Sequence, residues 1–210
     1  NKKLSLEELL NSNFSKNETV AEVLQNLIAK IGENIVIRRV LYLEANDDHS
    51  VFGSYIHNKI NDNIGRMACV VKLSSNENNK EIIDLANKIA MHITASRPLS
   101  IDERSLNKNF IEKEREIYSS QLKLSGKPDN IILKIVEGKI KKYLSDVTLL
   151  NQNWVLDPSL TVLQVVNEFN NNNNTDLLIT EFKLLILGEG IEIEEKSFSE
   201  EVASQVNNTS

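Results

Sequence analysis

The sequence predicts an α+β fold from which an antiparallel helical hairpin projects. Apolar runs between residues 35 and 73, separated by Asn- and Asp-rich turns, are typical of antiparallel strands. Elsewhere, apolar residues that recur every three or four positions are typical of amphipathic helices. Gly126 and Pro128 separate two long helical patterns whose apolar seams are thin, and this arrangement predicts a turn between two projecting helices.

The first predicted helix covers residues 18–31 and ends at Gly32, a residue type that commonly caps helices. Its apolar residues recur at spacings of four, three and four and share one face: Val20, Leu24, Leu27 and Ile31. Three segments rich in Ile, Val and Leu follow, at 35–44, 51–56 and 64–73. We expect them to form a three-stranded antiparallel meander.

A second helix is predicted over residues 82–93, with Pro98 shortly after its end, and we expect it to cover the sheet. The two arms of the hairpin come next. In the first arm the predicted apolar seam repeats every seven residues, at Phe110, Ile117 and Leu124. In the second arm apolar residues return every three or four positions: Ile132, Val136, Ile140, Tyr143 and Val147. At about 1.5 Å per residue each arm is roughly 30 Å long, so we expect the hairpin to extend away from the body.

Four further segments complete the chain. A short helix is predicted from Thr161, and the low-complexity Asn tract at 170–174 after it is expected to be a disordered loop. The strongly apolar residues 177–187 predict a buried strand. Apolar residues at steps of four predict a terminal helix over 197–206.

The composition argues against several classes of partner. The 210 residues carry 24 Lys and Arg against 30 Asp and Glu, a net charge of -6, so they lack the positive excess that drives binding to phosphate backbones. The apolar runs are much shorter than the ~20 residues needed to cross a bilayer. The single Cys69 cannot form an internal disulfide, which is typical of intracellular proteins, and its apolar neighbours predict a buried, unreactive thiol. We therefore expect neither direct nucleic-acid binding nor a membrane span.

The residue patterns of nucleotide-binding, metal-binding or catalytic sites are incomplete. The strings Gly188-Glu189-Gly190 and Gly126-Lys127 lack the other residues of nucleotide-binding loops. His49, His57 and His92 have no spacing of three or four that would place two ligands on one metal ion. We therefore expect no enzyme, no metal site and no cofactor.

Several strings occur in one order along most of the chain. They are Ala29-Lys30-Ile31-Gly32-Glu33-Asn34-Ile35, Ile37-Arg38-Arg39-Val40, Gly53-Ser54-Tyr55 with His57, Ile89-Ala90-Met91-His92, Ser125-Gly126-Lys127-Pro128, Ile135-Val136-Glu137-Gly138-Lys139, Asp157-Pro158-Ser159 and Gly188-Glu189-Gly190-Ile191. Together they resemble the translation elongation factor Ts family.

The resemblance implies a guanine-nucleotide exchange factor, not an enzyme, that binds the GTPase elongation factor Tu and promotes release of GDP. It also implies two small subdomains with three-stranded antiparallel sheets covered by helices, and a projecting antiparallel coiled-coil hairpin. On this basis residues 1–78 are assigned to the remainder of an N-terminal core subdomain, and residues 79–102 and 147–196 to a C-terminal core subdomain. Residues 103–146 are assigned to the hairpin and 197–210 to a C-terminal helix and tail.

The resemblance implies five partner-binding residues: Ile31, Gly32, His57, Val155 and Leu156. Without it, Ile31 and Gly32 are equally well explained as the last apolar residue of a helix and its cap. His57 would be a solvated histidine at a strand end, and Val155 and Leu156 would anchor a loop.

His92 lies in an equally recognisable string, but its neighbours Ile89 and Ile93 face the core, so we expect a structural histidine outside the partner surface.

The sequence departs from the family pattern at its start. It opens with Asn1, after the family's N-terminal helical module and its Thr-Asp-Phe-Val string, so we expect a fragment or a processed form. The abundance of Asn, Lys and Ile indicates an AT-rich coding sequence, which fits a plastid-type organelle or the mitochondrial matrix, or alternatively a bacterial cytoplasm. The alternative function is a coiled-coil interaction scaffold without exchange activity, and a homodimer stays open.

Overall fold

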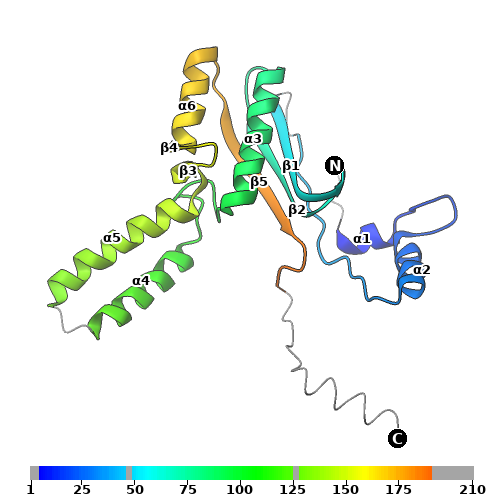
Figure 1. Ribbon diagram of the computed structural model, residues 1–210, viewed down its shortest axis with the longest axis horizontal. Helices are drawn as coiled ribbons and strands as arrows, with labels where there is room; N and C mark the ends of the chain where they lie inside the picture. The colour runs from blue at the N-terminus through cyan, green and yellow to red at the C-terminus, as the bar shows by residue number, and fades with distance from the viewer. Residues whose placement is uncertain (1–4, 46–48, 125–127, 191–210) are drawn as a thin grey trace, which may run out of the picture.

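The computed structural model describes residues 5–45, 49–124 and 128–190. A three-stranded sheet with one covering helix lies between a pair of small helices on one side and a pair of long helices on the other (Figure 1). In chain order the elements are α1 (Leu6–Asn11), α2 (Val20–Ile31), β1 (Ser50–Asn61), β2 (Ile64–Ser74), α3 (Lys80–Ser96), α4 (Lys108–Lys123), α5 (Asp129–Val147), the 3₁₀ turn η1 (Leu149–Asn151), β3 (Asn153–Trp154), β4 (Asp157–Thr161), α6 (Val162–Asn173) and β5 (Leu178–Ile186).

The three longest strands form one antiparallel sheet in the order β1, β2, β5. Strands β1 and β2 form a hairpin in which His57 lies opposite Met67. Strand β5 joins the free edge of β2 from the far end of the chain, with Leu178 opposite Ser74. The strands predicted at 51–56 and 64–73 are confirmed. A strand at 177–187 is confirmed as well, but its predicted burial is wrong, because no residue of β5 is fully buried and Leu178 is 63% exposed.

Helix α3 covers one face of this sheet (Figure 1). Its N-cap is Asn79, whose side chain accepts a hydrogen bond from the amide of Ile82 at 3.0 Å. Helix and sheet approach closely at Gly53, where an added Cβ would lie 2.2 Å from the carbonyl carbon of Ala86. A glycine at this position therefore sets the distance between α3 and β1. The core that results consists of Val51, Cys69, Val71, Leu73, Ile82, Leu85, Ala86, Ile89, Ala90, Ile93, Leu149, Trp154, Val162, Val166 and Leu177.

The strand predicted at residues 35–44 is wrong, because this segment has no ladder partner. A strand requires a neighbour for its backbone hydrogen bonds, and this segment pairs with neither of the two edge strands, β1 and β5. The apolar composition of the segment indicated a preference for strand structure but carried no information about a partner. The meander therefore consists of two consecutive strands, and its third strand is β5.

The described part of the chain contains one three-stranded sheet, where two were predicted. The other sheet is a two-stranded ladder between β3 and β4, with Trp154 opposite Asp157. The predicted subdomain boundaries stay a prediction.

Helices α4 and α5 lie side by side, run in opposite directions and extend away from the sheet (Figure 1). On α5 the predicted seam is confirmed at its buried residues Ile132, Val136 and Ile140. On α4 the predicted seam is wrong: Leu124 is 91% exposed, and Phe110 and Ile117 are about half exposed. The residues of α4 that pack against α5 are Ile111, Tyr118 and Leu122.

The difference between the predicted and the observed seam on α4 has a simple cause. A packed face needs apolar residues at steps of both four and seven, and the step of four from Tyr118 to Leu122 supplies the intermediate contact. The predicted seam has polar residues at the corresponding positions, Glu114 and Gln121.

The Asn tract at 170–174 is ordered, contrary to prediction: it forms the last turn of α6 and its cap. The Oδ1 atom of Asn170 accepts hydrogen bonds from the Leu177 amide and the Thr175 hydroxyl, both at 2.9 Å, and its Nδ2 donates to the Leu177 carbonyl at 3.0 Å. Asn174 adopts the left-handed conformation, with φ 52°, that Asn tolerates better than most residues. Composition alone misled here, because Asn side chains can satisfy a helix end. The terminal helix predicted over 197–206 lies outside the described residues.

Candidate functional site

The five predicted partner-binding residues lie at three separate places. Ile31 and Gly32 are at the end of α2, His57 is within β1, and Val155 and Leu156 join β3 to β4. Helix α2 and the β3–β4 ladder lie on opposite sides of the sheet (Figure 1). The structure therefore brings the members of each pair together but does not gather all five residues in one cavity.

The end of α2 presents an apolar side chain to solvent. The helix starts with a capping box, in which the Glu22 carboxylate accepts from the Thr19 amide at 2.7 Å, and this bond lowers the pKa of Glu22. It ends at Gly32, whose left-handed conformation (φ 78°) lets its amide donate to the Ile28 carbonyl at 2.8 Å. Ile31 is 51% exposed. The predicted helix end is confirmed, and contact with a partner stays a prediction.

His57 lies inside β1 and is partly buried, whereas the sequence placed it at a strand end. Its Nδ1 atom is 3.5 Å from the Tyr55 hydroxyl oxygen. A pocket of about 270 Å³ opens beside the two rings. Its lining combines apolar and polar side chains: Tyr55, His57, Met67, Met91, Thr94, Ala95 and Arg97.

Val155 and Leu156 are the two residues of a tight turn. Their side chains are 41% and 54% exposed. After the turn, the Asp157 carboxylate accepts from the hydroxyl and the amide of Ser159, at 2.6 and 3.1 Å, and these bonds lower the pKa of Asp157. The result is an apolar pair displayed at the tip of an ordered turn.

His92 is fully buried, as its neighbours in the sequence predicted. Its Nε2 atom is 3.0 Å from the Oε1 atom of Gln152. Its Nδ1 atom is 3.2 Å from the amide nitrogen of Val155, a contact with the exposed turn that the sequence analysis missed. Gln152 was missed as well, because a lone glutamine in a polar segment gives no pattern to recognise.

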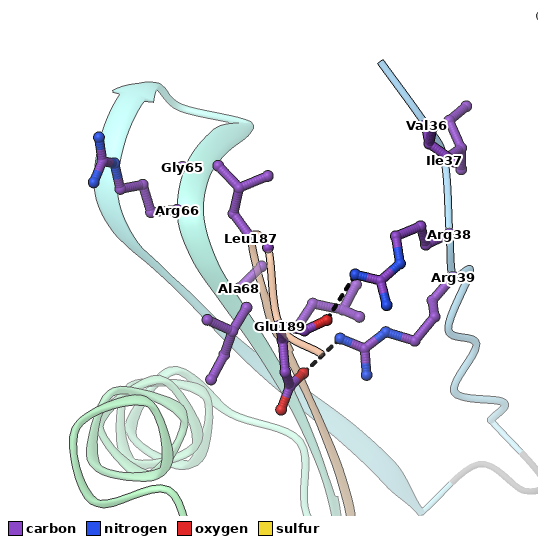
Figure 2. A pocket seen from close by; sticks show the side chains of 12 residues that line it. Val36, Ile37, Arg38, Arg39, Gly65, Arg66, Ala68, Leu187 and Glu189 are labelled. Atoms are coloured by element: carbon purple, nitrogen blue, oxygen red, sulfur yellow. Dashed lines mark hydrogen bonds and ion pairs between the residues drawn. The ribbon is translucent and has the colours of Figure 1, made fainter. Parts of the chain in front are cut away.

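A cluster of charged residues, also missed, connects residues 36–39 to the chain after β5 (Figure 2). Arg38 donates to the Glu189 carbonyl at 2.7 Å, and Arg39 pairs with the Glu189 carboxylate at 2.5 Å. The cluster borders a pocket of about 310 Å³. Two adjacent arginines within an apolar segment were the available signal, since charged side chains in such a segment usually have a partner.

Cys69 is buried as predicted, and burial raises the pKa of its thiol to about 12. Within the described ranges, no group of three or more His, Cys, Asp or Glu side chains could hold a metal ion. None of the described helices is long and apolar enough to cross a bilayer.

Comparisons with known proteins identify the family to which the chain belongs. A sequence model described as elongation factor TS matches residues 1–189. The chain is 43% identical over 184 residues to elongation factor Ts of Rickettsia peacockii (strain Rustic), which covers 87% of this chain and 59% of the relative. It is 39% identical over 201 residues to elongation factor Ts of Rickettsia felis, which covers 95% of this chain and 64% of the relative. The chain thus spans about three fifths of the length of these relatives.

These matches define the class of protein as a translation elongation factor. The chain belongs to the elongation factor Ts family. Both relatives are bacterial, which agrees with the bacterial alternative stated above, and an organellar location stays a prediction.

Proposed function

We propose that this chain acts as a guanine-nucleotide exchange factor that binds elongation factor Tu and promotes release of GDP. The observation that supports the proposal most directly is the family match, which extends over residues 1–189. Because the chain spans about three fifths of its relatives, the activity of the whole protein is part of the proposal.

The proposed mechanism is differential binding and not chemistry. An exchange factor must bind the nucleotide-free GTPase more tightly than the GDP-bound GTPase, because a ligand shifts an equilibrium only by the difference between its two affinities. Side chains that dock and lose water are sufficient for such a role. We therefore propose that the chain is not an enzyme and that it works without a cofactor, in a bacterial cytoplasm.

The proposed contacts are the end of α2, His57 and the turn of Val155 and Leu156. The apolar side chains of the turn are about half exposed, so they have area left to bury against a partner. Their partial exposure also means that truncation removes little buried area from the free protein. A contact that matters for binding but not for folding is the property expected of a docking residue.

The test is the double variant Val155→Ala, Leu156→Ala. We expect it to weaken binding to nucleotide-free elongation factor Tu by about 1–3 kcal/mol, or roughly 5- to 150-fold, and to slow release of fluorescent GDP at subsaturating concentration. Leu99→Ala is the matched control, because Leu99 is also 54% exposed and lies outside the proposed contacts. A strong fall in melting temperature with unchanged affinity would place the turn in the core and contradict the proposal.

The second candidate function is an interaction scaffold that works through α4 and α5. The extension of these helices away from the sheet favours it (Figure 1). A scaffold of this kind would leave GDP release from elongation factor Tu unchanged at any concentration of the chain. The same fluorescence measurement on the unmodified protein therefore separates the two candidates.

A further inference from the structure

Two buried polar side chains, His92 and Gln152, lie beneath the turn of Val155 and Leu156. His92 is fully buried in α3, and Gln152 is 6% exposed at the end of η1. Burying a polar group without a hydrogen-bond partner destabilises the folded protein, so the hydrogen-bond partners of these two residues indicate their role.

The hydrogen bonds define which ring nitrogen of His92 carries the proton. The backbone amide of Val155 can only donate, so the Nδ1 atom of His92 must accept and is unprotonated. The Nε2 atom then carries the proton and donates to the Oε1 atom of Gln152 at 3.0 Å. Burial lowers the pKa of His92, which favours this neutral ring, while the bond to Gln152 opposes the shift.

The Gln152 amide group has the matching orientation. Its Nε2 atom donates to the Asp146 carbonyl at 2.7 Å and to the Ser96 carbonyl at 3.3 Å. These carbonyls belong to the last turns of α5 and α3. The backbone carbonyl of Gln152 accepts from the amide of Val162 at 3.0 Å, where α6 begins. One residue therefore connects the ends of two helices to the start of a third.

The same imidazole ring supports the turn in a second way. The Trp154 ring stacks on the His92 ring, with centroids 5.2 Å apart and planes 23° apart. Trp154 is the residue immediately before the turn and is itself buried. His92 thus holds Trp154 by stacking and Val155 by a hydrogen bond, while the side chains of Val155 and Leu156 remain exposed.

We propose that His92, oriented by Gln152, is a positioning residue that fixes the turn of Val155 and Leu156 in the geometry that contacts the GTPase. This inference rests on the proposed function. A histidine needed only for packing would use its ring faces, and an apolar side chain could replace it. Here both nitrogens are bonded, and one of them is bonded to the first residue of the turn.

Two variants of His92 separate its two nitrogens. His92→Asn places an amide oxygen near the position of Nδ1, so the bond to Val155 can re-form, while the link to Gln152 is lost. His92→Gln reaches toward Gln152 but has no acceptor near the position of Nδ1. Both variants remove the aromatic stacking on Trp154, so they form a matched pair for general destabilisation.

Two readouts are measured for each variant: amide hydrogen exchange at Val155, and affinity for nucleotide-free elongation factor Tu. We expect His92→Gln to lose about tenfold in both Val155 protection and affinity, and His92→Asn to stay within about threefold of the unmodified chain in both. Equal affinity of the two variants, or loss of Val155 protection without loss of affinity, would overturn the inference.

Failure of the proposed function has a different signature, because the unmodified chain would then not bind elongation factor Tu at all. If either variant does not fold, the unmodified chain still provides a test. A Val155 amide that exchanges as fast as a solvent-exposed amide in the native protein would contradict the inference.

Discussion

Replacing Gly53 by Ala tests how closely α3 packs on the sheet. The added Cβ would lie 2.2 Å from the carbonyl carbon of Ala86, 2.4 Å from its carbonyl oxygen and 2.6 Å from its Cβ. Favourable contacts between carbon atoms lie near 3.5–4.0 Å, so α3 must move away from β1 by about 1 Å or more. The nearest atoms belong to the helix backbone and cannot rotate aside. Truncating Ala86 to Gly is therefore not expected to rescue the variant.

The magnitude follows from the cost of overpacking. Extra atoms in a well-packed core cost about 1–3 kcal/mol, and a displaced helix also loosens its contacts with the rest of the core. We expect a loss of about 3 kcal/mol, which for a chain of this size corresponds to a fall of roughly 6–12 °C in melting temperature. The assay is urea unfolding monitored by circular dichroism. The slope of the unfolding free energy against urea concentration should be the same in the variant and in the unmodified protein.

The chain offers a matched control in Gly138→Ala. Gly138 lies inside α5, and an added Cβ there meets no atom within 4 Å. The same methyl group is expected to raise stability by about 0.5–1 kcal/mol, because alanine is a better helix former than glycine. If Gly53→Ala were as stable as the unmodified protein, the close approach of α3 to β1 described above would be wrong.

Two further predictions concern the core and the end of α6. Burial holds the pKa of Cys69 near 12, while an unfolded thiol ionises near 9. We therefore expect no reaction with a thiol reagent at pH 8 without denaturant, and a loss of stability as the pH rises from 9 toward 12. Rapid labelling of the folded protein would contradict the burial of Cys69. Asn170→Ala removes the hydrogen bonds to Thr175 and Leu177, and we expect it to lower the free energy of unfolding in urea by about 1–3 kcal/mol. The control Asn171→Ala changes an exposed position of the same helix and should not lower the free energy of unfolding. Equal stability of the two Asn variants would show that the tract has no capping role.

The sequence predicted local structure well wherever the signal was periodic. Helix α2 with its Gly32 cap, helix α3 and the β1–β2 hairpin follow from spacing and turn residues alone. Residues 35–44 show the limit of this reasoning, because strand formation depends on a partner that composition does not reveal. On α4 two neighbouring sets of apolar residues could form the seam, and only packing against α5 decides between them.

The candidate site was predictable only in part. Resemblance to a family gave positions such as Val155 and Leu156, and the structure gives their exposure and their support. The roles of Gln152 and of Glu189 depend on contacts between residues far apart in the chain, Gln152 with His92 and Glu189 with Arg39. Contacts at such separation leave no short-range pattern in a single sequence.

The strand order β1, β2, β5 has a consequence for the chain during its synthesis on the ribosome. The edge of β2 that finally pairs with β5 stays open while α3 to α6 are being made, since Ser74 must wait for Leu178. At about 5–20 residues per second, that interval lasts on the order of ten seconds. Throughout this time an unpaired edge of β-branched and apolar residues is available to other nascent chains. The nascent protein is therefore expected to depend most on protection by chaperones before its last strand emerges.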